Sequence, residues 1–180
     1  LTFTSKKELE TLKNLLNKEL EILDLREKQE KLNSSEDKKF YELLIAQKNT
    51  ELEIIVLELQ LKDEKKDLKA KTEIRKKVIA LKILVINNSF KMIENHFDLY
   101  EKEVIKPMGD LSHIDLNNIA DPSVRGFFET MINENKEYLS KPKDERIQKA
   151  KGDLNTKMDK LKFEQDTNSQ FYFLTEHLKE

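Results

Sequence analysis

The chain contains no cysteine, and it has only three glycines and three prolines among its 180 residues. The absence of cysteine excludes disulfide bonds and thiolate metal sites. Sheets with tight turns need glycine and proline, so the scarcity of these two residues favours long helices instead. Leucine, lysine and glutamate, which are abundant here, readily form helices. The composition therefore predicts an all-α fold.

A long apolar run is also missing. The most apolar segment, VIALKILVI at 78–86, is too short to cross a bilayer and contains Lys82. The opening residues, LTFTSKKELE, have neither the basic nor the apolar region of a signal peptide. We expect any signal or lipid-anchor segment to lie upstream of this sequence.

What is abundant is charge. Charged residues make up 38% of the chain and apolar residues 37%, which is lean for a compact core. Such compositions are often disordered, but the net charge of only −2 and the regular apolar spacing argue for folding. We expect a single elongated helical domain over residues 1–180, with a coiled-coil hairpin arm at 1–66 and a bundle part at 67–180.

Helix-capping signals divide the chain into segments. Ser5, followed by Glu8, predicts a helix that runs to about Leu32. The sequence NSSED then breaks it, and Ser34 or Ser35 can cap a second helix. Because the connection is short, these two helices are expected to form an antiparallel hairpin.

From Lys38 to about Lys106 there is no glycine or proline, so one helix of almost 70 residues is predicted. Apolar residues in its second half alternate steps of four and three, as in a coiled-coil seam: Ile79, Ile83, Ile86, Phe90, Ile93, Phe97, Tyr100 and Val104. A second apolar line through Val78, Leu81 and Val85 predicts packing against a further neighbour.

Pro107 and Gly109 end this long helix. The following loop, 107–121, is expected to tuck four apolar residues onto the bundle: Leu111, Ile114, Leu116 and Ile119. Asp121 before Pro122 predicts the start of a short helix. Ser140 and Pro142 precede a last helix with an apolar face made by Ile147, Leu154, Met158 and Leu161, which can extend to FYFLTEHL at 171–178.

No catalytic constellation is visible. His96, His113 and His177 are far apart, and there is no two-histidine metal motif, glycine-rich phosphate loop or nucleophile elbow. Glu94, Asp98 and Glu101 share helical spacing but lack the Glu-x-x-His partners of a di-metal bundle, so a solvated acidic face is expected. The aromatic residues 171–173 are read as a packing cap. We expect no enzymatic activity, no metal and no cofactor.

Charge is unevenly distributed along the chain. Residues 62–91 hold ten basic and four acidic groups, and residues 138–162 hold eight and four. On a continuous helix, the first group forms a stripe interrupted only by Glu73 and containing Lys62, Lys65, Lys66, Lys69, Lys76, Lys77 and Lys91. A second stripe on the last helix contains Arg146, Lys149, Lys157 and Lys160, and the two merge if these helices pack together.

Such stripes are usually solvated helix faces. However, lysine point charges along roughly 40 Å of helix also suit the phosphates of duplex DNA without reading its sequence. Aromatic residues do not interleave with the lysines and arginine is scarce, so single-strand stacking and base-specific recognition are not indicated. The sequence therefore favours the basic residues of the two stripes, apart from Lys91, as a non-specific DNA-binding surface.

The chain resembles the ectodomain of a surface lipoprotein of the Lyme-disease spirochaete, Borrelia. The resemblance rests on four features: the hairpin of long charged helices, the NSSED break, a composition rich in lysine and asparagine, and the missing anchor cysteine. The chain is most similar to paralogous family twelve, whose members resemble the coiled-coil arm of structural maintenance of chromosomes proteins. This resemblance implies a protein at the cell surface or in the periplasm, lipid-anchored to the outer membrane, that binds DNA without sequence preference.

Two alternatives remain open. By the same overall sequence features, the chain also resembles paralogous family fifty-four of that organism, which includes binders of complement regulators. That resemblance implies a host-protein adhesin or an immune-evasion lipoprotein. Its partner would be held by an apolar or aromatic patch in the 107–121 loop or at the FYFL end. The other alternative is a self-associating coiled coil, which unsatisfied apolar seams would favour.

Overall fold

The computed structural model describes residues 6–109, 111 and 113–177. Its described part is all-α, as predicted. In chain order the elements are α1 (Lys6–Glu30), α2 (Ser35–Leu61), α3 (Leu68–Tyr100), the π-helical turn η1 (Glu101–Ile105), the 3₁₀ turn η2 (Leu116–Asn118), α4 (Pro122–Ser140) and α5 (Lys143–His177). The predicted cap at Ser5 lies outside the described residues.

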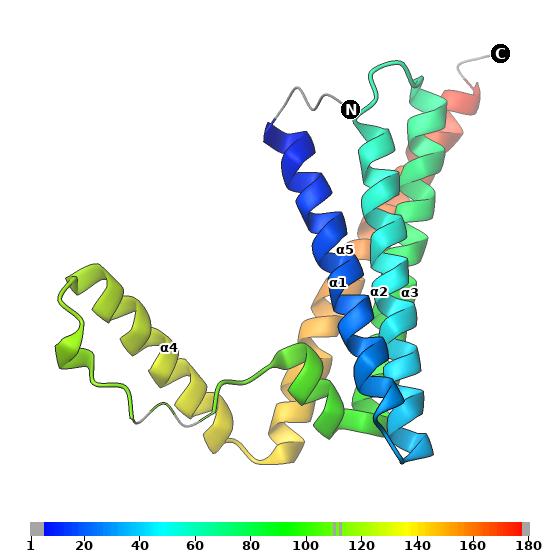
Figure 1. The fold of residues 1–180 in the computed structure, drawn as a ribbon. Helices are drawn as coiled ribbons and strands as arrows, with labels where there is room; N and C mark the ends of the chain where they lie inside the picture. Colours follow the sequence, from blue (N-terminus) through cyan, green and yellow to red (C-terminus); the bar gives the residue numbers. More distant parts are fainter. Residues whose placement is uncertain (1–5, 110, 112, 178–180) are drawn as a thin grey trace.

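Helices α1, α2, α3 and α5 form an elongated bundle, and α4 stands away from it (Figure 1). Successive helices of the bundle run antiparallel, so the turn between α2 and α3 lies at the same end as the start of α1 and the end of α5. The main contacts join α1 to α2, α2 to α3, and α3 to α5. Helix α3 is therefore the central element.

The main core lies where all four bundle helices meet. Phe40 of α2 and Met92 of α3 are fully buried there, α1 contributes Leu25, and α5 contributes Met158. Burying side chains of this size stabilises a fold by roughly 1.5–3 kcal/mol each. The seam predicted on α3 faces this core, with its four best-buried members being Ile86, Ile93, Phe97 and Tyr100.

A second, smaller core lies between α2 and α3, nearer the turn that joins them. It contains Ile54 from α2 with Ile74 and Val78 from α3, and Leu81 and Val85 pack against it. The second apolar line predicted on α3 therefore packs against α2, which also contributes to the main core. These two faces explain why α3 can pack against both α2 and α5.

The prediction of one helix from Lys38 to Lys106 is wrong. The chain leaves α2 after Leu61 and begins α3 at Leu68. Two aspartates make the reversal without glycine or proline: Asp63 accepts a hydrogen bond from the backbone N–H of Lys65, and Asp67 caps α3 by accepting one from Ala70. Residues 62–67 include no apolar side chain that could anchor a continuing helix, so these local bonds prevail.

Two other capping predictions are confirmed, those at Ser34 and Asp121, whereas Ser140 is the last residue of α4 and α5 begins only at Lys143. Ser34 caps α2 by accepting a hydrogen bond from the Asp37 N–H. Asp121 caps α4, with Pro122 at its first helical position. Helix α5 continues to His177, as the sequence allowed.

Candidate binding surfaces

The ten basic residues predicted to bind DNA fall into three structural groups. Lys62, Lys65 and Lys66 lie in the turn between α2 and α3, rather than on a continuous helix. Three acidic residues, Asp63, Glu64 and Asp67, share this six-residue turn and balance its charge. The predicted stripe is therefore broken at its beginning.

Lys69, Lys76 and Lys77 form the second group, on the first three turns of α3. Lys69 and Lys76 interact with other groups of the chain. Lys77 is exposed. Of these three lysines, Lys77 therefore presents its ammonium group to solvent without an ion pair in the described part of the chain.

The third group lies on α5. Arg146 is only partly exposed and is held by Glu101, with its Nη1 atom 2.6 Å from Oε1. Lys149, Lys157 and Lys160 are exposed. Within the described part of the chain, no ion pair involves these three lysines or Lys62, Lys65, Lys66 and Lys77.

The stripe residue Lys77 of α3 lies on a different face of the bundle from the stripe lysines of α5. Lys157 and Lys160 line a groove together with Lys82 of α3. Lys77 precedes Lys82 by five residues, which places it about 140° away around the helix. The two stripes therefore do not join into one ridge, although α3 and α5 do pack together.

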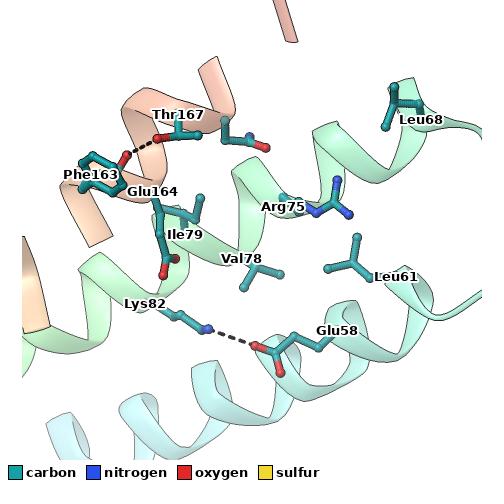
Figure 2. Close-up of a pocket in the computed structure, with 11 residues that line it drawn as sticks. Glu58, Leu61, Leu68, Arg75, Val78, Ile79, Lys82, Phe163, Glu164 and Thr167 are labelled. Carbon is teal, nitrogen blue, oxygen red and sulfur yellow. Dashed lines mark hydrogen bonds and ion pairs between the residues drawn. The ribbon is translucent and has the colours of Figure 1, made fainter. Parts of the chain in front are cut away.

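A groove of about 650 Å³ lies among α2, α3 and α5, beside the turn between α2 and α3 (Figure 2). Its apolar lining includes Leu61, Val78, Ile79 and Phe163. The charges at its rim are mixed, since Lys82 pairs with Glu58 at 3.0 Å and the remaining charged residues are Arg75 and Glu164. This groove has no excess of one charge and no nucleophile paired with a base.

The segment from Pro107 to Ser140 forms a separate structure, which we call the arm; it comprises the loop 107–121 and α4 (Figure 1). The expectation that this loop tucks onto the bundle is wrong, because the loop packs along α4 instead. Asn135 donates to the Met108 carbonyl and Arg125 donates to the Ile119 carbonyl. Ile132 is the one described residue of α4 that is buried.

The arm leaves apolar side chains in solvent. Phe127 is 61% exposed and its ring meets Phe128 edge-on, at a centroid distance of 5.9 Å. Val124 and Leu139 are also exposed. An aromatic side chain at this exposure forms an apolar surface on a helix that stands away from the bundle (Figure 1).

The π-helical turn η1 fixes the base of the arm. Its Glu101 accepts hydrogen bonds from Arg146 of α5 and from Tyr138 at the end of α4. Burial and the hydrogen bond to this carboxylate raise the pKa of Tyr138 to about 12. Glu101 is thus a half-buried joint between three elements, whereas the sequence suggested a solvated acidic face.

A second carboxylate of the same turn points to the other helices. Glu103, whose side chain is almost fully buried, accepts a hydrogen bond of 2.9 Å from Tyr41 of α2 and pairs with Lys28 of α1 at 3.2 Å. Burial and this hydrogen bond raise the pKa of Tyr41 to about 12. The turn therefore links the arm to every helix of the bundle.

The sequence contained only a weak signal for these joints. Glu101 and Glu103 lie between the last two residues of the predicted seam, Tyr100 and Val104, and nothing in the sequence distinguishes them from exposed carboxylates. Arg146 resembled any other member of a basic stripe. The aromatic residues 171–173, predicted to form a packing cap, have side chains outside the described part of the structure.

Among the described residues, no group of histidine and carboxylate side chains is arranged to hold a metal ion. None of the helices described has the length and apolarity needed to cross a membrane. Comparison with protein-family models, with curated proteins and with solved structures finds no match to this chain. The chain can therefore be classified by its fold alone. It is an all-α bundle with a projecting helical arm.

Proposed function

We propose that this chain is a non-enzymatic binding protein whose arm holds a protein partner. The observation that carries the proposal is the exposure of Phe127 on a helix that stands away from the bundle. Large aromatic side chains contribute most of the binding energy in many protein interfaces, because they bury much area at a small entropic cost. Val124 extends the same exposed edge of α4, one helical turn away.

The joint at Glu101 supports this proposal. An arm that swings freely loses conformational entropy when a partner holds it, and this loss weakens binding. Arg146 and Tyr138 attach the arm to the bundle through one half-buried carboxylate. A pre-oriented arm reduces the entropic cost and allows a small apolar patch to bind usefully.

The charge of the arm indicates the chemistry of its partner. Residues 107–140 contain two basic and six acidic side chains, a net charge of −4. Glu134 lies two helical turns after Phe127 and on the same side of α4. A complementary partner is a protein surface with an apolar pocket for Phe127 and lysine or arginine side chains around that pocket.

Selection from a displayed random-peptide library tests this function. Peptides enriched on the wild-type chain are expected to contain basic residues beside an aromatic or aliphatic one. They are expected to bind Phe127→Ser at least tenfold more weakly. Phe163→Ser is the matched control, since Phe163 is 73% exposed on α5 and lies outside the arm.

Two results would contradict the proposal: no enriched peptide, or enriched peptides that bind the Phe127→Ser variant as tightly as the wild type. Far-ultraviolet circular dichroism of each variant checks that its helix content is retained. Equal loss in the Phe163→Ser control would place the binding surface on the bundle instead.

Non-specific binding of duplex DNA is the second candidate, and the seven basic side chains without ion pairs favour it. If about five of them contact phosphates, log affinity falls against log salt with a slope of about −4 to −5. Lys149→Glu/Lys157→Glu/Lys160→Glu should weaken binding strongly. Lys7→Glu/Lys38→Glu/Lys136→Glu is the control, because it changes the net charge equally at exposed lysines elsewhere.

Fluorescence titration with a random-sequence duplex at several salt concentrations measures both effects. No binding near physiological salt would exclude this candidate. Equal losses in the two triple variants would show that the net charge, and not the α5 surface, controls binding. The cell-surface or periplasmic location and the lipid anchor belong to the same set of proposals, and rest on the resemblance alone.

A further inference from the structure

Helix α1 exposes a row of leucines on the side that faces away from the bundle. Leu9, Leu16, Leu20 and Leu23 are each more than half exposed, and Leu20 reaches 63%. The two buried residues of this helix are Ile22 and Leu25. At 100° per residue, the mean direction of the four leucines lies about 160° from the mean direction of those two.

This row has the spacing of a helix-pairing seam. Leu9, Leu16 and Leu23 recur every seven residues, and Leu20 lies beside them. Solvated helix faces seldom keep one apolar residue type at successive heptad positions. We propose that this leucine row is a self-association surface, on which α1 of a second copy of the chain packs antiparallel.

Charges along the two flanks of the row support a second copy as the occupant. In an antiparallel pair centred on Leu16, each flank meets the same flank of the partner helix, and residue numbers that face one another add up to about 32. Lys6 then faces the second copy's Asp24 on one flank, and Arg26 faces its Glu8 on the other. The two-fold symmetry repeats both contacts, which gives four pairs of opposite charge.

A parallel pair is less favourable. In that arrangement each residue near the seam meets its own copy, so Glu27 meets Glu27 directly in line with the leucines. Antiparallel packing moves these two carboxylates to opposite ends of the interface. The pattern of charge therefore selects the orientation as well as the partner.

The size of the interface sets the expected strength. Two helices of this length bury on the order of 1,000 Å² when they pair, which is near the lower limit for a specific interface. We therefore expect a reversible dimer that forms at micromolar concentrations. The arm and the groove beside Phe163 take no part in it.

Sedimentation equilibrium over a range of protein concentrations tests the association. The wild type is expected to shift from monomer to dimer, and Leu16→Glu/Leu20→Glu is expected to weaken the dimer at least tenfold. The matched control is Leu68→Glu/Leu84→Glu, which places two charges at exposed leucines on α3. A wild type that stays monomeric throughout, or a dimer unchanged in the Leu16→Glu/Leu20→Glu variant, would overturn the proposal.

Disulfide trapping tests the orientation of the two helices. Because the chain has no cysteine of its own, any disulfide that forms must join the introduced residues. A mixture of Leu9→Cys and Leu23→Cys chains is expected to give the mixed disulfide-linked dimer. Leu9→Cys alone is expected to give little, since its two copies lie about 20 Å apart in the antiparallel pair. Efficient trapping of Leu9→Cys with itself would overturn the antiparallel arrangement.

Discussion

Arg146 and Glu101 form an ion pair in which one guanidinium nitrogen, Nη1, lies 2.6 Å from one carboxylate oxygen and 2.7 Å from the other. The Nε atom of Arg146 is buried and has no hydrogen-bond partner in the described structure. A planar guanidinium that bonds through one nitrogen uses little of its fork geometry. The pair therefore depends on charge and position more than on bidentate recognition.

Removing this arginine should destabilise the fold. Arg146→Met leaves the half-buried Glu101 carboxylate without its cation, and we expect the free energy of unfolding to fall by about 2 kcal/mol. Arg146→Lys should lose less, because a single nitrogen makes both contacts in the wild type. Urea unfolding followed by circular dichroism measures both changes.

The control for this prediction is Lys39→Met, which breaks an ion pair with Glu36 at the surface. Both of those side chains are about two-thirds exposed, so the loss should stay below about 0.5 kcal/mol. If Arg146→Met costs no more than this control, the joint at Glu101 is not a stabilising element.

Stability should decrease at alkaline pH through two tyrosines. Tyr41 and Tyr138 have pKa values near 12 in the folded chain, against 10.0 for an unperturbed tyrosine. Since the folded state favours the neutral phenol, the extra stability is complete below pH 10 and is lost as the pH rises towards 12. Urea unfolding across this interval should show the decrease.

The variant Tyr41→Phe/Tyr138→Phe separates this effect from the titration of lysines. It removes the two phenol groups and keeps their rings, so its stability should fall less steeply between pH 10 and 12 than that of the wild type. Parallel curves for the two proteins would show that these phenols are not responsible.

The reversal between α2 and α3 depends on a capping side chain. Asp67→Ala removes the acceptor for the Ala70 N–H and should cost about 1 kcal/mol in the free energy of unfolding. Asp67→Asn should be nearly neutral, since asparagine caps helices about as well. Thermal unfolding of the two variants distinguishes them, and equal losses would mean that the negative charge matters more than the cap.

Lys106 ends the π-helical turn in a left-handed conformation, with φ of 50°. A residue with a Cβ atom is strained there by roughly 1–2 kcal/mol, and glycine is not. Lys106→Gly should therefore raise the free energy of unfolding by up to about 1 kcal/mol. Lys102→Gly, inside the turn, should lower it by a similar amount. A loss of stability in Lys106→Gly would contradict this account.

Local chemistry made much of the secondary structure predictable. Ser34, Asp121 and Pro122 are residues whose side chains determine where a helix starts, whatever surrounds it. The alternation along α3 likewise reflects burial on two faces, which any packing partner enforces. These signals can be read without knowing the tertiary structure.

The end of α2 at Leu61 was harder to predict from the sequence than the helix starts. Aspartate is tolerated within helices, so Asp63 and Asp67 indicate a turn only when the apolar residues on both sides can pack together. Ile54 and Val78 do pack together across the reversal, and that contact was not apparent from spacing alone. The error carried over to the lysine stripe, whose geometry assumed a continuous helix.

The candidate surfaces were less predictable than the fold. Exposure depends on what a helix packs against, and α1 and α4 have apolar faces that the bundle leaves uncovered. Phe127 is as apolar in the sequence as Phe40, which is fully buried. Only the arrangement of the helices distinguishes an aromatic residue of the core from one that meets solvent.

The arm also has a consequence for how the polypeptide folds. It separates α3 from α5 in the chain, so the last helix must close a long loop before it reaches its place. The entropic cost of such closure grows only logarithmically, by about 0.6 kcal/mol for each doubling of loop length. Helices α1, α2 and α3 have short connections and can assemble first, with α5 docking afterwards; insertions or deletions within the arm should alter this last step and leave the earlier ones unchanged.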